Sequence, residues 1–329
     1  MRRREVIAHL AGVLTWAAAA KASAQSKKTP VIGFLGASSA STAASVLLPA
    51  FRRGLEELGF VEGQNVVVEY VWADSLYDRL PPLAAELVRR RVDVIVAAGG
   101  SIAALVAKAA TSSIPIIALA GDDPVRLGLA ASINRPGGNV TGIVQLVVAS
   151  EGKRLEILRE LVPDAKVVAF LANPGRPNSQ RQIQEMQAAA QALGLELLVV
   201  QADDDDDLAQ ALSVAQAGAA AVVVGADPYF FARHERIIAL AERHALPAMY
   251  FFREFVVAGG LVSYGSSLTD AYRQVGVYTG QILKGADPAQ LPMWQQSEKL
   301  ELVINARTAK ALGLTIPATV LTRADEVIE

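Results

Sequence analysis

The chain has 329 residues, 52% hydrophobic and 19% charged, with three histidines and no cysteine. This length predicts two domains, each large enough for its own hydrophobic core. The absence of cysteine excludes a disulfide scaffold, a thiolate zinc site, an iron–sulfur cluster and a lipid anchor on an N-terminal cysteine. A formal charge of −2 and a pI near 6.0 argue against nucleic-acid binding, which usually requires a basic surface.

The N-terminus has the pattern of an export signal. Arg2–Arg4 precede the mostly apolar run Val6–Ala20, which is shorter than the roughly 20 residues that span a bilayer, and Ala22–Ala24 fits a cleavage site. Arg3 and Arg4 also fit a twin-arginine signal, so both export routes stay open. The alternatives are a membrane anchor or an amphipathic cytosolic helix. We predict that residues 1–24 are removed and that the mature chain, with a formal charge of −5, is periplasmic and inserts in no membrane.

After this signal, short apolar runs alternate with segments of helical periodicity. We predict strands at 31–36, 65–72, 93–98 and 114–119, and helices at 43–58, 76–91 and 102–111. Continuous apolar strands separated by helices are typical of a parallel sheet that is covered on both faces. The first half of the chain therefore predicts a doubly wound α/β lobe.

The same pattern restarts after a seam near 137–150. Here we predict strands at 166–172, 196–200, 219–224 and 246–251, and helices at 180–193 and 231–244. In both 92–119 and 220–251, an apolar strand ends in glycine, a helix follows, and an Ile-Pro or Leu-Pro pair opens the next strand. This repetition indicates an internal duplication, and therefore a second lobe built like the first.

The last segment is too short for a third lobe. Its predicted strands are 260–264 and 300–304, and its predicted helices are 269–283 and 306–312. We expect these elements to complete the two sheets, so that the chain crosses between the lobes more than once. The predicted fold class is α/β, with two doubly wound Rossmann-like lobes. The first lobe comprises residues 30–145 and about 267–289, and the second comprises 146–266 and about 290–329.

Motifs for catalysis are missing. The chain has no GxGxxG dinucleotide fingerprint, no P-loop and no GxSxG nucleophile elbow. His234 and His244 stand ten residues apart among charged neighbours, which favours a solvated helix face over a metal site. The run Asp203–Asp207 lacks the glycine and terminal glutamate of an EF-hand, so we interpret it as a loop that caps a helix beginning at Leu208. We expect no enzymatic activity, no cofactor and no metal.

Small polar residues follow the predicted strands of both lobes. In doubly wound sheets, ligands bind beyond the carboxyl ends of the strands, where helix N-termini offer free N–H groups. Helix capping favours the same residue types, so each position alone has two explanations. Their occurrence at nearly every strand end predicts a binding cleft. The candidates are Ser38, Ser39, Ser101, Asp122, Asn173 and Asp227.

Aromatic residues gather behind two strand ends of the second lobe. They include Tyr229 and Phe251, with Arg253 close by. Core packing explains some of them, but the group also suits a planar or apolar ligand with a charged head. Arg253 is a candidate for a bidentate clamp on a ligand carboxylate, the alternative being a salt bridge to Glu254 or to a hinge aspartate.

Several segments also form longer patterns. They are Asn134–Gly142, which contains Arg-Pro-Gly-Gly-Asn-Val-Thr-Gly, together with Phe252–Phe255, Gly259–Gly265 and Glu301–Asn305. On these segments the mature chain resembles the bacterial ABC-transporter substrate-binding proteins related to the tryptophan-binding TrpX type. The resemblance implies a type I periplasmic binding fold with three crossovers and a cleft that closes on its ligand. The cleft positions that it implies are Ser38, Ser39, Ser101, Asp122, Asn173, Asp227, Tyr229, Phe251 and Tyr264.

These observations predict a monomeric periplasmic solute-binding protein. We expect it to capture a small amino-acid-like or aromatic carboxylate ligand by hinge closure and to deliver it to an ABC permease in the inner membrane. One alternative is a sensor subunit that reports ligand occupancy to a membrane receptor. A further alternative is an enzyme on the same scaffold.

Overall fold

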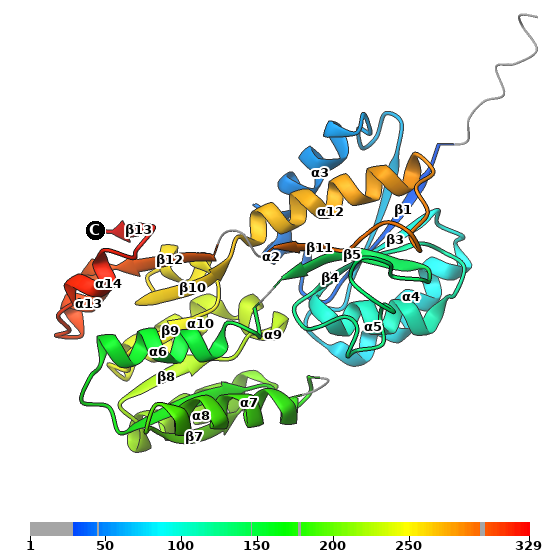
Figure 1. Ribbon diagram of the computed structural model, residues 1–329. Coiled ribbons are helices and arrows are strands. Elements are labelled where there is room, and N and C mark those ends of the chain that lie inside the picture. The colour runs from blue at the N-terminus through cyan, green and yellow to red at the C-terminus, as the bar shows by residue number, and fades with distance from the viewer. Residues whose placement is uncertain (1–28, 45, 146, 177–178, 297–299) are drawn as a thin grey trace, which may run out of the picture.

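The computed structural model describes residues 29–44, 46–145, 147–176, 179–296 and 300–329. The predicted export signal lies outside these residues. Within them, no helix has both the length and the apolar character needed to cross a membrane. The chain forms two α/β lobes that lie side by side, and helices pack on both faces of the sheet in each lobe (Figure 1).

The first lobe contains a parallel sheet in the order β11-β5-β4-β3-β1-β2. Its strands are β1 (Val31–Gly36), β2 (Val67–Trp72), β3 (Val94–Ala98), β4 (Ile116–Ala120), β5 (Val140–Gln145) and β11 (Trp294–Gln296). Its helices are α2 (Ala40–Ala44), α3 (Leu47–Glu57), the short η1 (Tyr77–Arg79), α4 (Leu80–Arg89), α5 (Gly100–Ala110) and α12 (Leu268–Leu283). The residues of β3 and β4 are all buried, as expected for strands that are covered on both faces.

The second lobe contains a sheet in the order β13-β12-β10-β9-β8-β6-β7. Its strands are β6 (Val167–Ala172), β7 (Glu196–Gln201), β8 (Ala221–Val224), β9 (Ala248–Tyr250), β10 (Val262–Ser266), β12 (Leu300–Asn305) and β13 (Glu326–Ile328). Its helices are α6 (Glu151–Leu161), α7 (Ser179–Ala192), α8 (Asp205–Gly218), α9 (Pro228–Ala232), α10 (His234–Arg243), α11 (Arg253–Val257), α13 (Ala306–Ala311) and α14 (Ala318–Leu321). Only β12 runs antiparallel to its neighbour β10 among the paired strands that the structure describes.

The two sheets repeat one plan. The order β5-β4-β3-β1-β2 of the first lobe corresponds to the order β10-β9-β8-β6-β7 of the second. The predicted α/β class with two doubly wound lobes is therefore confirmed. The chain passes between the sheets after β5, after β10 and after β11. The last passage follows Trp294–Gln296, a few residues beyond the predicted return near 290, because β11 still pairs with β5.

The structure differs from the sequence expectations in several elements that were not predicted (β5, α6, α11, β11, α14 and β13) and in two helix breaks. The predicted helix 43–58 is divided into α2 and α3, and the predicted helix 231–244 into α9 and α10. The predicted seam contains β5 and leads directly into α6. Gly142 allows β5 to pair with β4, because its φ is +140° and a Cβ there would overlap the backbone of Ala118.

Helices α3 and α12 cross at unusually close range on one face of the first sheet. A Cβ at Gly54 would overlap the carbonyl oxygen of Arg273, and a Cβ at Gly276 would overlap that of Phe51. Glycine therefore lets the two backbones touch, and α12 holds against the first lobe although it follows most of the second lobe in the sequence. This contact fixes one end of the passage from β10 back to the first lobe.

Candidate functional site

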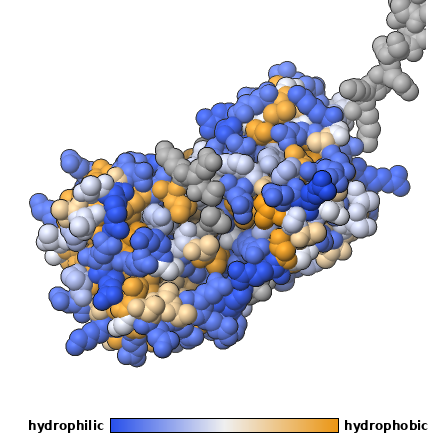
Figure 2. Space-filling view, viewed as in Figure 1, coloured by the Kyte–Doolittle hydropathy of each residue, from blue (hydrophilic) through white to orange (hydrophobic). Residues whose placement is uncertain are grey.

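A cavity lies between the two lobes, at the carboxyl ends of both sheets. It encloses about 790 Å³, including the part that opens to solvent. Ser38, Gly100, Ser101 and Gln145 line it from the first lobe, and Arg176, Asp227, Phe231 and Phe251 line it from the second. Figure 2 shows the waist between the lobes, where hydrophobic residues come to the surface of a mainly hydrophilic face. This position is where doubly wound folds bind ligands.

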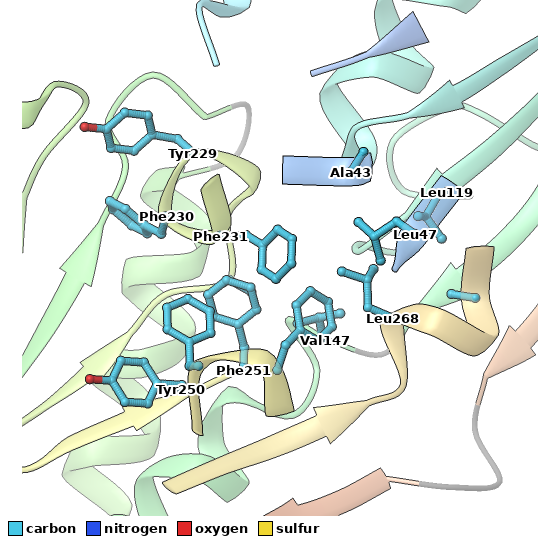
Figure 3. Close-up of a cluster of buried hydrophobic side chains, with 14 of the residues drawn as sticks. Ala43, Leu47, Leu119, Val147, Tyr229, Phe230, Phe231, Tyr250, Phe251 and Leu268 are labelled. Carbon is cyan, nitrogen blue, oxygen red and sulfur yellow. The ribbon is translucent and has the colours of Figure 1, made fainter. Parts of the chain in front are cut away.

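One wall of the cavity is apolar. Phe231 extends from α9 towards Leu47 of the first lobe, and Phe251 lies beneath it (Figure 3). The Phe231 ring meets the Phe252 ring edge to face, with the ring centroids 5.7 Å apart. Leu119 and Leu268 complete this wall from the first lobe. The arrangement suits a flat apolar group, because aromatic edges and faces contact such groups with little loss of side-chain freedom.

A carboxylate stands on the second-lobe side. Asp227 is the N-cap of α9 and only 4% exposed. Its Oδ1 accepts hydrogen bonds from the Tyr77 hydroxyl (2.8 Å), Asn173 Nδ2 (2.9 Å) and Tyr229 N (2.8 Å). Its Oδ2 is buried and has no hydrogen-bond partner within the part of the chain that the structure describes. A carboxylate oxygen in this condition favours a donor from a ligand, because a buried acceptor without a partner is costly.

The N-terminal end of α5 lines the cavity from the first lobe. Helix α5 begins at Gly100, whose φ of +71° is favourable for glycine, and a Cβ at Gly99 would overlap Ala37. These two glycines bring the start of α5 against the loop that follows β1, which carries Ser38. The first N–H groups of a helix have no partner within the helix and carry a partial positive charge. This end of the cavity therefore favours an anion.

A buried ion pair joins the lobes beside the cavity. Arg176 Nη2 donates to Asp122 Oδ2 at 2.6 Å, and Arg181 Nη2 donates to Asp122 Oδ1 at 3.3 Å. Ser101 Oγ donates to the same carboxylate at 3.0 Å. Burial opposes the charge on Arg176, but the neighbouring carboxylates, Asp122 first, outweigh burial and raise the pKa of its guanidinium. The guanidinium is therefore permanently charged.

A second buried pair supports the floor of the cavity. Arg154 is fully buried and donates to the carbonyl oxygens of Val147 (2.7 Å) and Tyr264 (3.2 Å). Burial lowers its pKa to about 10, so it stays cationic at neutral pH. Glu151 lies 3.5 Å from it and accepts from Ala226 N at 3.1 Å. Arg154 thereby ties the residues after β5 to β10, near two of the passages between the lobes.

A second contact between the lobes lies on the opposite side of the cavity. Tyr77 follows β2, whereas Asp122 follows β4, and these strands lie on opposite sides of β1 and β3 in the sheet. The Tyr77 hydroxyl donates to Asp227 and accepts from Tyr229 N at 3.0 Å. Arg233 Nη1 also donates to Ser75 Oγ at 3.3 Å. In this structure the lobes are therefore closed on each other from both sides.

The structure brings six of the sequence-predicted site residues together. Ser38, Ser101, Asp227 and Phe251 line the cavity. Asp122 and Asn173 stand directly behind that wall, and hold Arg176 and Asp227 respectively. Each follows a strand end, as expected for a parallel α/β lobe.

Four predicted residues lie elsewhere and do not line the cavity. Ser39 bonds Ser41 and Thr42 at the start of α2, as a helix-capping residue would. The Tyr229 hydroxyl points away from the cavity and donates to Asp205 at 3.1 Å (Figure 3). Tyr264 packs in the core of the second lobe.

Arg253 is the fourth of these residues. It pairs with Glu301 at 3.4 Å and with Glu326 at 2.7 Å, away from the cavity. Its guanidinium is thus occupied by two carboxylates of the second lobe. The structure therefore gives no support to a clamp on a ligand carboxylate by this residue. Arg253 forms salt bridges, as in the predicted alternative, but its partners are Glu301 and Glu326 and not Glu254 or a hinge aspartate.

The sequence reasoning did not identify several residues of the site. Tyr77, Gln145, Arg176 and Tyr272 were not among the predicted positions, whereas Phe231 belongs to the aromatic group that was expected to suit a planar or apolar ligand. The run Asp203–Asp207 caps a helix, as expected, through Asp204, which is the N-cap of α8. However, α8 begins at Asp205, three residues before the expected start at Leu208. His234 lies at the start of α10, with its Nδ1 2.9 Å from the carbonyl oxygen of Phe231.

The fold and the cavity define a class of protein. Two doubly wound lobes, joined by several passages and with a cavity at their junction, form the fold of the type I periplasmic binding proteins. The chain belongs to the ABC transporter substrate binding protein family, which matches residues 47–328. It is therefore a binding protein and not an enzyme.

Three relatives place the chain within this family. It is 26% identical to a tyrosine-binding protein from Clostridioides difficile over 264 residues, which cover 80% of this chain and 75% of that protein. It is similar to the structure of an ABC domain from Streptococcus pneumoniae in complex with L-Trp, with 26% identity, a TM-score of 0.81 and coverage of 91% of this chain and 100% of that one. A conserved domain protein from Vibrio cholerae matches with 26% identity, a TM-score of 0.80 and the same coverage.

Proposed function

We propose that this substrate-binding protein receives an amino acid with an aromatic or large apolar side chain for an ABC importer. The ligand lies in the cavity between the lobes. The observation that carries this proposal is Asp227 Oδ2, a buried carboxylate oxygen in the cavity wall without a partner among the described residues. The relatives that bind tyrosine and L-Trp support the same class of ligand.

The cavity matches an amino-acid zwitterion at both poles. The ligand ammonium group donates to Asp227, which makes a charge-assisted hydrogen bond in a site shielded from water. The ligand carboxylate accepts from the first N–H groups of α5 and from Ser38 in the other lobe. The side chain lies against Phe231 and Phe251. Because the two poles belong to different lobes, one ligand holds both lobes.

Hinge closure is the mechanism that we propose. A ligand held by both lobes binds the closed arrangement better than the open one, and so it shifts the population towards closure. The contacts of Tyr77 with Asp227 and of Asp122 with Arg176 stabilise the closed arrangement directly. The closed, loaded form is then the form that meets the permease.

Calorimetry and thermal unfolding of the mature chain test the ligand class. The probes are L-tryptophan, L-tyrosine, L-leucine, L-lysine and D-glucose. A ligand present at 100 times its Kd adds about 2.7 kcal/mol to the free energy of unfolding, which a melting curve detects readily. Binding of an aromatic amino acid supports the proposal. Binding of glucose without binding of any amino acid contradicts it.

A substitution at Asp227 tests the ammonium site. Asp227→Asn removes the charge but keeps an acceptor for Tyr77 and Asn173. We expect about 100-fold weaker binding of the aromatic amino acid, and little change for indole-3-propionate, which has no ammonium group. Asp203→Asn, at an exposed aspartate, is the matched control. Equal losses for both ligands would show that Asp227 supports the fold rather than the ammonium group.

We also propose that the protein works in the periplasm. The support is the pattern of residues 1–24, together with membership of an ABC-transporter family. Cell fractionation and N-terminal sequencing of the secreted form test this placement. A start at Gln25 is the expected result, and replacement of Arg3 and Arg4 by lysine separates the two export routes.

A further inference from the structure

Arg176 brings a fixed positive charge into the cavity wall. It follows β6, lines the cavity, and leaves only 10% of its side chain exposed. One terminal nitrogen donates to Asp122 Oδ2 and the other to the carbonyl oxygen of Ala226. Because both ends of the fork are held by the protein, the guanidinium has a fixed position in the closed arrangement of the lobes.

The buried charges around this residue cancel only in part. Glu151 and Arg154 form one buried pair beneath the cavity. Asp122 and Asp227 remain, and both are almost fully buried. Arg181 also contacts Asp122, but 30% of its side chain is exposed and it does not line this cavity. Arg176 is therefore the buried cation that offsets one of the two aspartates on the cavity side, so that this wall carries one net negative charge with Arg176 and two without it.

We propose that Arg176 is a specificity-determining residue that limits the negative charge of the cavity wall and so disfavours ligands with a net positive charge. This inference rests on the proposed function as an amino-acid receptor and deepens it. A zwitterion satisfies Asp227 without adding charge to the site. A free amine or a cationic amino acid adds one positive charge beside the guanidinium, where the charges are poorly screened. Arg176 acts through the electrostatic repulsion between its charge and that of the ligand, and it needs no contact with the ligand.

Paired ligands that differ by one carboxylate test the inference. The pairs are L-tryptophan with tryptamine and L-tyrosine with tyramine, and the pair used is the one whose amino acid the wild type binds. Calorimetry or competition gives the affinity for each member. In Arg176→Met we expect the amine to bind at least about tenfold more tightly than it binds the wild type.

Two control variants separate charge from other effects. Arg176→Lys keeps the positive charge, and Arg181→Met removes a partly exposed charge from the same carboxylate. We expect the amine affinity of both to stay within about threefold of the wild type. The double variant Arg176→Met with Asp122→Asn removes one charge of each sign, and we expect it to lose most of the gain in amine binding.

The outcomes are distinct. Unchanged amine affinity in Arg176→Met overturns the inference, and so does a gain that persists in the double variant. A preference that changes only because amino-acid binding is lost would make Arg176 a carboxylate-binding residue and also overturns it. If Arg176→Met does not fold, Asp122→Asn tests the opposite sign, with amine binding expected to weaken relative to amino-acid binding. If the wild type binds no amino acid, that result contradicts the proposed function, and the inference, which depends on it, is then also wrong.

Discussion

Removal of the Tyr77 hydroxyl is expected to weaken ligand binding, although this hydroxyl is not proposed to contact the ligand. Tyr77 belongs to the first lobe, and its hydroxyl donates to Asp227 Oδ1 of the second lobe at 2.8 Å. Burial and the neighbouring Asp227 carboxylate raise the pKa of Tyr77 well above its ordinary value, so the hydroxyl keeps its proton at neutral pH. Tyr77→Phe removes this donor and leaves the ring in place.

The size of the effect follows from the partners. A hydrogen bond to a charged group contributes about 1.5–3 kcal/mol. Asp227 Oδ1 retains two other donors, Asn173 and Tyr229, so the loss falls in the lower half of that range, at about 1.5–2 kcal/mol. The bond exists only when the lobes are closed. Because ligand affinity depends on the closed population, Kd should rise about 10- to 30-fold.

Calorimetry measures the loss, and small-angle scattering measures the compactness of the ligand-free and saturated forms. Tyr70→Phe is the matched control, since its hydroxyl donates to Glu62 at 3.1 Å within the first lobe. We expect the control to leave Kd unchanged. Equal losses in both variants, or a Tyr77→Phe protein with wild-type affinity, would refute the argument that the contact between the lobes contributes to binding.

Three further predictions concern the scaffold. Arg253→Ala should leave ligand affinity within about twofold in calorimetry, and should lower the free energy of unfolding by less than about 1 kcal/mol, because its ion pairs are partly exposed. Gly54→Ala should cost about 3 kcal/mol or more and lower the Tm by several degrees, whereas Gly138→Ala, with open space around it, should not. Burial of Asp205 opposes its charge, but hydrogen bonds from Arg233 and Tyr229 outweigh burial and hold its pKa below 3.8, so its stabilisation exists above about pH 4 and is lost as the pH falls through the lowered pKa. Urea unfolding should therefore separate wild type from Asp205→Asn at pH 6, and the difference should shrink as the pH falls below about 4.

Much of the fold was predictable because strands that are buried on both faces appear in the sequence as continuous runs of apolar residues. Ile116–Ala120 and Val167–Ala172 are examples, and both lie where expected. Strand β5 was not predicted, because its segment was interpreted as the seam between the lobes, whereas Gly142 there is needed for close pairing with β4. The division of two predicted helices, into α2 and α3 and into α9 and α10, was not predicted.

The candidate site was predictable only where it depends on strand ends. Ser38, Ser101 and Asp227 follow their strands directly, and a parallel sheet collects such positions at one edge. Tyr77 was not predictable, because its partner Asp227 is 150 residues away in the other lobe. Arg253 was misplaced for a related reason, since its partner Glu326 comes from the last strand of the chain.

The three passages between the lobes have a mechanical consequence. Two bodies on a single tether can swing, tilt and twist independently. Here β5 and β11 are neighbours in one sheet, β10 and β12 are neighbours in the other, and Gln145 bonds Ser266 across the junction at 3.3 Å. Several connections that lie side by side act as a hinge, and a hinge leaves the two lobes one axis of rotation. In the proposed delivery to a permease, the relative position of the two lobes would therefore be described by a single opening angle.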